Sequence, residues 1–205
     1  MRKFDRLKSR VVPLPRTNVD TDQIIPARFL KTSERGDLSG ALFADWRFDA
    51  EGRPRADFVL SDPRHAGAEI LLAGDNFGCG SSREHAAWAL ADYGFRAVIS
   101  PRFADIFKSN ALKNSLLPIE VEASYWQALA DAAAANAMFE VTVDLERCQI
   151  RAPALEPQRF EVEPFARHCL LEGVDALDFL LSQGAAIQAF ESTRTAPIDT
   201  RRCLD

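Results

Sequence analysis

The chain has 205 residues, of which 47% are hydrophobic and 27% charged. This composition predicts a folded domain with a sizeable core and excludes wholesale disorder. With 25 Lys and Arg against 30 Asp and Glu, the net charge is −5, which argues against nucleic-acid binding because phosphates require a basic surface. No apolar run is long enough for a membrane span, and the charged N-terminus lacks the apolar stretch of a signal peptide. We therefore expect a cytoplasmic protein.

The cysteines argue against a metal site made by this chain alone. They stand at Cys79, Cys148, Cys169 and Cys203. Their spacing matches neither a zinc site nor an iron–sulfur ligand set, and the chain has only 3 histidines. A disulfide framework is not expected either, because such frameworks belong to small secreted domains.

The N-terminal third combines one short strand with long irregular stretches. A strand is predicted at residues 11–14, and a polar turn at 18–26 leads into a short apolar segment that Pro26 ends. Residues 33–67 are rich in Gly, Asp, Arg and Pro, and long loops of this kind are commonly functional. We expect a functional or mobile loop here, within a single domain that spans residues 1–190.

The middle of the chain has the most regular pattern. Nearly continuous apolar runs predict buried strands, and apolar residues at helical spacing predict helices between them. The predicted elements are strands at residues 69–73, 96–100 and 116–120 and helices at residues 81–93 and 102–114. This alternation of strands and helices predicts parallel pairing.

The C-terminal part is predicted to join a small antiparallel group of strands to helices. The expected elements are an Ala-rich helix at residues 125–138, strands at 139–143, 149–151 and 159–162, and helices at 165–171 and 175–190. The polar tail at residues 191–205 is expected to be loosely ordered.

The Gly-rich loop GDNFGCGSSRE at residues 74–84 is the strongest candidate for a binding site. Its glycines allow a sharp turn and close approach to a ligand, and the following helix offers unpaired N–H groups to an anion. Arg83 adds a guanidinium suited to a carboxylate or phosphate. The loop matches neither phosphate-binding nor dinucleotide patterns, so we expect a small anionic molecule. A structural alternative stays open, because Ser81 and Glu84 have the spacing of a capping box.

Two motifs extend this loop to a family resemblance. The run NFGCGSSREHA at residues 76–86 and the run NVDTDQIIP at residues 18–26 resemble the two signatures of the aconitase-family swivelling domain. Segments at 43–48, 88–95 and 103–107 resemble, more narrowly, the bacterial small-subunit family of 3-isopropylmalate dehydratase. The resemblance covers most of the chain and implies an α/β fold, a three-layer β/β/α swivelling domain as in the aconitase C-terminal domain.

The resemblance also implies an activity and a partner. Members of this family are hydro-lyase subunits of leucine biosynthesis, and the reaction interconverts 2-isopropylmalate and 3-isopropylmalate by removing water and adding it back. A large subunit is implied to hold a [4Fe-4S] cluster whose iron acts as a Lewis acid on the leaving hydroxyl and one carboxylate. This chain is expected to bind no cofactor itself. An exposed apolar face is expected where the large subunit docks.

Residue by residue, the resemblance implies the following roles. Ser81 is the base, and Asp22 is a carboxylate that supports proton handling. Ser82 and Arg83 bind substrate carboxylates, and Lys31 lies near a substrate-binding position at the start of the mobile loop. From the residues alone, two alternatives remain: Ser81 acts mainly as a helix cap, and Asp22 only stabilises its own turn.

Two other functions stay open at this point. The chain could be the small subunit of a related hydro-lyase that acts on another substituted malate, and residues 28–45 are expected to discriminate between such substrates. It could instead be a non-catalytic module that binds an anion within an assembly. Cys79 and His85, inside the Gly-rich motif, are expected to be structural.

Overall fold

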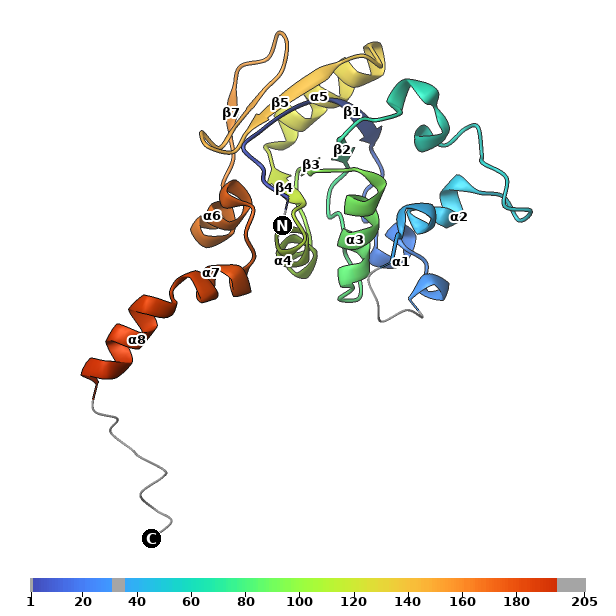
Figure 1. Ribbon diagram of the computed structural model, residues 1–205. Coiled ribbons are helices and arrows are strands. Elements are labelled where there is room, and N and C mark those ends of the chain that lie inside the picture. The colour runs from blue at the N-terminus through green and yellow to red at the C-terminus, as the bar shows by residue number, and fades with distance from the viewer. Residues whose placement is uncertain (1, 31–35, 195–205) are drawn as a thin grey trace.

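The computed structural model describes residues 2–30 and 36–194 (Figure 1). Within them, seven strands form one sheet in the order β4-β3-β2-β1-β5-β6-β7. The strands are β1 (Arg6–Leu14), β2 (Ile70–Ala73), β3 (Ala97–Ser100), β4 (Leu117–Glu120), β5 (Glu140–Asp144), β6 (Gln149–Arg151) and β7 (Gln158–Arg159). No helix among the described residues is long and apolar enough to cross a membrane.

Strand β1 connects a parallel half of the sheet to an antiparallel half. Its second part pairs in parallel with β2, with Val12 beside Leu71, and β2, β3 and β4 continue in parallel. Its first part pairs antiparallel with β5, with Ser9 opposite Val141. The predicted parallel pairing is confirmed, but the predicted strand at residues 11–14 covers only the second part of β1.

The two faces of the parallel strands are buried against different layers. Leu71 and Val98 pack with helices α3 (Glu84–Tyr93) and α4 (Asp105–Lys113). Leu72 and Ile99 point the other way, into a core closed by the antiparallel strands and helix α5 (Ala123–Ala135). Figure 1 shows α3 and α4 on one side of β2 and β3, and α5 and β5 on the other. The expected three-layer β/β/α arrangement is confirmed.

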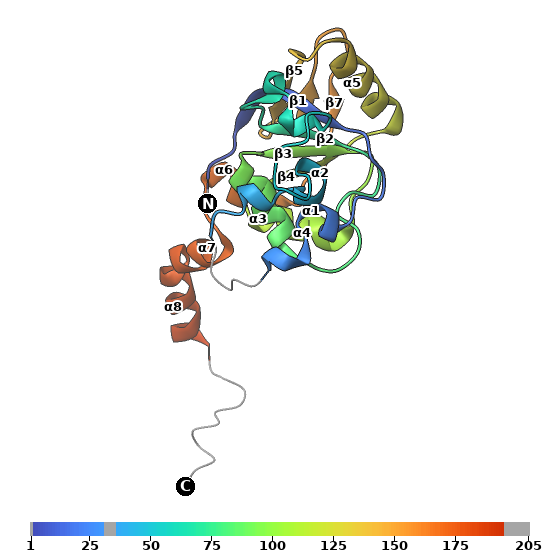
Figure 2. The same cartoon turned by 90° about the vertical axis from the view of Figure 1, so that its right-hand side faces the viewer.

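The C-terminal helices leave the body of the domain. Helix α6 (Pro164–Glu172) is hydrogen-bonded to the segment before β1, since the Phe4 N–H donates to the Leu170 carbonyl at 2.8 Å. Helices α7 (Ala176–Ser182) and α8 (Gly184–Thr193) then extend away (Figure 2). They carry most of the large exposed apolar side chains of the described residues, namely Leu177, Leu180, Leu181, Ile187 and Phe190.

These helices differ from the pattern predicted for the C-terminus. One helix was expected at residues 175–190, and the structure divides it at Gln183. Helix α8 continues to Thr193, so the first residues of the expected loose tail are helical. Residues 195–205 lie outside the described residues.

Short helices punctuate the stretch that was expected to be a mobile loop. They are η2 (Ser39–Ala41), α2 (Ala44–Arg47), η3 (Val59–Ser61) and η4 (Pro63–His65). Phe43 is fully buried and stacks on Trp46 with ring centroids 5.5 Å apart, and Phe58 meets its edge at 6.0 Å. Phe43 and Phe58 also belong to the core cluster that contains buried residues of α3 and α4, which attaches residues 36–67 to the helical side of the domain. Residues 33–35 lie outside the described part. Mobility of the loop stays a prediction.

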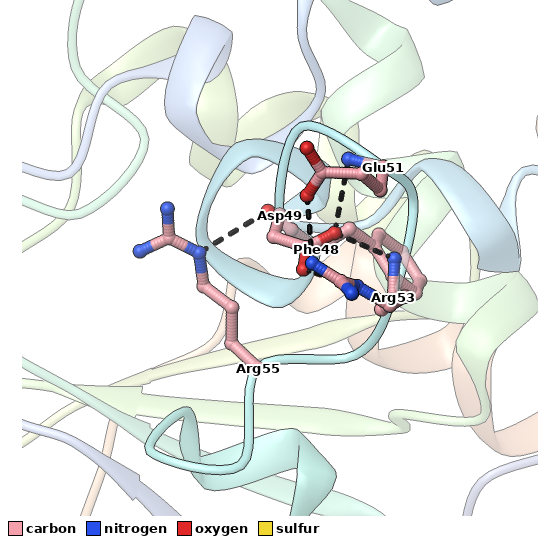
Figure 3. A network of polar contacts seen from close by, with 5 residues as sticks. All are labelled: Phe48, Asp49, Glu51, Arg53 and Arg55. Carbon is pink, nitrogen blue, oxygen red and sulfur yellow. Dashed lines mark hydrogen bonds and ion pairs between the residues drawn. The ribbon is translucent and has the colours of Figure 1, made fainter.

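The outermost turn of this stretch is closed by its own charges (Figure 3). The Asp49 carboxylate accepts hydrogen bonds from the Arg53 N–H at 2.8 Å and from the Glu51 N–H at 3.0 Å. The Arg53 guanidinium pairs with both acidic side chains at 2.8 Å. These bonds, the Arg53 N–H first, hold the pKa of the Asp49 carboxyl below its usual value. The turn is therefore stabilised locally, without using groups of the candidate site.

Candidate active site

The two signature segments, far apart in sequence, are joined by backbone hydrogen bonds. The Gly78 N–H donates to the Val19 carbonyl at 2.7 Å, and the Thr21 N–H donates to the Cys79 carbonyl at 2.9 Å. Thr21 is a buried residue, only 2% exposed, and its hydroxyl donates a hydrogen bond to the Ser81 carbonyl at 2.9 Å. These contacts fix the position of the serine loop, the part of the Gly-rich loop that carries Ser81 and Ser82, relative to the motif at residues 18–26.

Helix α1 (Thr21–Ile24) carries Asp22 toward the Gly-rich loop. Asp20, not Asp22, caps this helix, because its carboxylate accepts the Gln23 N–H at 2.8 Å in a capping box. The Asp22 carboxylate instead accepts a hydrogen bond from Nη1 of Arg83 in an ion pair. The alternative that Asp22 only stabilises its own turn is therefore not what the structure shows.

The start of helix α3 also differs from the pattern in the sequence. The helix begins at Glu84 rather than Ser81, and Arg83 stands at the N-cap without a side-chain cap. Glu84 does not take part in a cap, because its carboxylate accepts a hydrogen bond from the Asn114 amide at 2.8 Å. The alternative of a capping box between Ser81 and Glu84 is therefore wrong. The first-turn N–H groups of α3 therefore remain without a side-chain cap and are suited to an anion.

Gly78 allows the Gly-rich loop to pack directly against α4. Its φ is +77°, and a Cβ at this position would lie 2.3 Å from Cγ of Phe107. Phe107 is buried and meets the edge of Phe77 with centroids 5.3 Å apart. Only glycine allows this approach at a left-handed backbone angle.

Replacing Gly78 with alanine is expected to lower the free energy of unfolding by about 2–4 kcal/mol, from the left-handed backbone and the overpacking against Phe107. Urea unfolding followed by circular dichroism measures this loss. The matched control is Gly184→Ala, where the added methyl meets open space and stability should hold. Equal midpoints for Gly78→Ala and the unchanged chain would contradict this packing.

A cavity of about 210 Å³ lies where the serine loop meets the start of α4. Ser81, Ser82 and Arg83 line one side of it, and both serines are exposed to solvent. The start of α4 adds Ala104, Asp105, Ile106 and Phe107 to the lining. The structure thus brings three of the five predicted site residues into one cavity, and the ion pair to Arg83 adds Asp22.

The ion pair has one sheltered and one open partner. The Arg83 side chain is 19% exposed, whereas the Asp22 side chain is 51% exposed. A guanidinium shielded from water attracts an anion more strongly than a fully solvated one. The ion pair also orients Arg83, so the cation is held in place before a ligand arrives.

The fifth predicted residue, Lys31, lies outside the described residues. The chain before it forms helix η1 (Ala27–Phe29), and Leu30 packs against the helical-side core. Arg28 pairs with Asp45 at 2.6 Å and ties this segment to α2. The role of Lys31 stays a prediction.

The donor groups of the part of the chain that the structure describes do not fit an iron–sulfur cluster. Cys79 lies in the Gly-rich loop, Cys148 precedes β6, and Cys169 is buried in α6, so the cysteines of the described residues do not converge. Burial raises the pKa of the Cys79 thiol, whereas metals bind the thiolate. Within residues 2–30 and 36–194 no group of three or more His, Cys, Asp or Glu could hold a metal ion.

Comparison with known proteins matches this geometry to a family. The model of the aconitase C-terminal domain matches residues 1–124. The 3-isopropylmalate dehydratase small subunit of Anaeromyxobacter sp. (strain K) is 56% identical over 188 residues, which cover 92% of this chain and 96% of that protein. The corresponding subunit of Roseiflexus castenholzii is 50% identical over 200 residues, 98% of each chain.

The chain belongs to the family of 3-isopropylmalate dehydratase small subunits. A solved structure agrees with this assignment. The crystal structure of 3-isopropylmalate dehydratase from Methanocaldococcus jannaschii superposes with a TM-score of 0.65 at 26% identity. The match covers 91% of this chain and 99% of that one. Family membership extends over both signature motifs and the C-terminal helices of this small-subunit chain.

Two contributors to the site were missed by the sequence analysis. Thr21 holds the serine loop through its hydroxyl. The one sign of this role in the sequence is that a polar residue stands shortly before the apolar pair Ile24 and Ile25. Ile106 lines the cavity while 53% exposed, and nothing in its helical pattern sets it apart from a surface residue.

Proposed function

We propose that this chain is the small subunit of a 3-isopropylmalate dehydratase, a hydro-lyase of leucine biosynthesis, and that it supplies the base and the carboxylate-binding groups of the active site. Family membership supports the hydro-lyase activity. The observation that carries the residue roles is the Asp22–Arg83 ion pair beside the cavity that Ser81 and Ser82 line.

Binding of the substrate is assigned to the polar wall of the cavity. A carboxylate placed there meets the free edge of the Arg83 guanidinium, a fork whose geometry suits two oxygens. The Ser82 hydroxyl and the uncapped first-turn N–H groups of α3 add donors. Such a set of donors fixes the orientation of a substrate that carries carboxylates.

The proton step is assigned to Ser81. As an alkoxide, its Oγ takes the proton from the carbon next to a substrate carboxylate and becomes a hydroxyl; the electron pair of the broken C–H bond forms the double bond as hydroxide leaves. A serine alkoxide needs stabilisation at neutral pH, and the Arg83 guanidinium with the α3 N–H groups provides it. Asp22 keeps Arg83 in place, and its half-exposed carboxylate links the site to solvent.

The remaining half of the site is assigned to a large subunit. In this proposal the partner would supply the [4Fe-4S] cluster, whose Lewis acidity would assist the departure of the substrate hydroxyl, because the donor groups of the described residues do not fit a cluster. We therefore describe the chain as a protein-only contributor of binding and proton-transfer groups. The relatives are named small subunits, which supports such a division.

The isolated chain is expected to show no turnover of 2-isopropylmalate, because it holds only part of the active site. Activity should appear when a large subunit with an intact cluster is added under anaerobic conditions, and it should saturate with the amount added. The large subunit alone is the control and should also be inactive. Turnover by this chain alone would contradict the two-subunit assignment.

The same assay separates the two alternatives. Higher kcat/KM for another substituted malate than for 2-isopropylmalate would favour the related hydro-lyase. A stable complex with the large subunit that turns over none of these substrates would favour the non-catalytic anion-binding module.

A further inference from the structure

An exposed isoleucine stands in the wall of the candidate active site. Ile106 is the second residue of α4, it is 53% exposed, and it lines the same cavity as Ser81, Ser82 and Arg83. The large exposed apolar residues of the described chain otherwise lie away from this cavity, most of them on α7 and α8. An apolar side chain left open to solvent in a cavity that also holds charged and hydroxyl groups is suited to a ligand with an apolar part.

The position of Ile106 relative to the serine loop is fixed by its neighbours. The next residue, Phe107, fits against Gly78 at a distance that excludes any side chain there. The Ala104 N–H donates to the Phe77 carbonyl at 3.1 Å, which ties the start of α4 to the Gly-rich loop. Ile106 therefore belongs to a rigid part of the site, which a specificity contact requires.

The residues that line the cavity are of different chemical kinds. The serine loop contributes a guanidinium and two hydroxyls, and the start of α4 contributes Ala104, Asp105 and Ile106. Asp105, which precedes Ile106 and is exposed, disfavours a negatively charged group near the start of α4 by like-charge repulsion. The volume of about 210 Å³ suits a small branched molecule with carboxylates at one end and hydrocarbon at the other.

We infer that Ile106 is a specificity-determining residue that contacts the isopropyl substituent of the substrate. The inference rests on the proposed function and adds to it which side chain distinguishes the isopropyl group from smaller or charged substituents. Ile106 makes an apolar contact and takes no part in proton transfer. Its contribution therefore falls on discrimination between substrates.

The test compares Ile106→Ala with the unchanged chain in the reconstituted enzyme, using 2-isopropylmalate and the analogue in which methyl replaces isopropyl. We expect kcat/KM for 2-isopropylmalate to fall about tenfold or more, and kcat/KM for the methyl analogue to change by less than about threefold. Met138→Ala, which truncates an equally exposed apolar residue outside the cavity, is the matched control and should leave the ratio unchanged.

Two outcomes would overturn the inference. One is an equal loss of kcat/KM for both substrates. The other is a loss that disappears as the large subunit is raised to saturation, which would make Ile106 a contact with that subunit. The unchanged chain reports on the proposed function separately: if it fails to turn over 2-isopropylmalate with the large subunit, the proposed function fails before Ile106 is tested.

Discussion

Replacing Ser81 by alanine is expected to lower kcat of the reconstituted enzyme by about 10²–10⁴-fold, the range typical for losing a positioned base. The fold should survive, because Ser81 does not cap α3 and its side chain is exposed. Its link to Thr21 uses the backbone carbonyl, which alanine retains. Steady-state kinetics with saturating large subunit and a thermal unfolding curve measure the two quantities.

The neighbouring serine provides the matched control. Ser82→Ala should raise KM by several-fold with a smaller change in kcat, because Ser82 is assigned to binding rather than to proton transfer. If Ser81→Ala keeps its rate and loses only stability, Ser81 is structural and the proton step has to be assigned elsewhere.

Replacing Arg83 by alanine is expected to cost roughly 2–5 kcal/mol of transition-state stabilisation, measured as the fall in kcat/KM, since a largely shielded charged partner of the substrate carboxylate is lost. Arg83→Lys should recover part of it, because lysine keeps the charge but not the planar fork. Asp22 is left without its partner in Arg83→Ala, and its half-exposed position limits the effect on stability.

A second arginine, which is ion-paired but does not line the cavity, serves as the control for this prediction. Arg102 pairs with Asp75 at 2.9 Å, and both side chains are well exposed, at 63% and 42%. Arg102→Ala should change stability by no more than about 1 kcal/mol and leave kcat/KM unchanged. Unchanged kinetics in Arg83→Ala as well would remove Arg83 from the site.

The parallel half of the fold was predictable because its strands are buried on both faces. Residues 69–73 and 96–100 are nearly continuous apolar runs, and such runs separated by helical patterns leave few other arrangements. The first part of β1 was missed for the opposite reason. There Leu7 and Ser9 are buried while Arg6 and Lys8 face solvent. So short an alternation of buried and charged residues resembles a polar terminus in the sequence.

The motifs in the sequence indicated candidate residues for the site, but the contacts between them could not be predicted. Ser81 and Glu84 have the spacing of a capping box, but Asn114, which follows α4, binds Glu84 and leaves α3 uncapped. The pairing of Asp22 with Arg83 likewise depends on backbone bonds that join two distant segments. Such tertiary contacts compete with local preferences, and a single sequence does not reveal the winner.

The central claim is that this chain removes the substrate proton with Ser81, and isotope exchange tests it most directly. Reconstituted enzyme is incubated with 2-isopropylmalate in heavy water, and deuterium at the carbon that loses its proton is followed by mass spectrometry. We predict that the unchanged chain incorporates deuterium and that Ser81→Ala, with the substrate bound, does not. Incorporation by Ser81→Ala at the rate of the unchanged chain would contradict the claim.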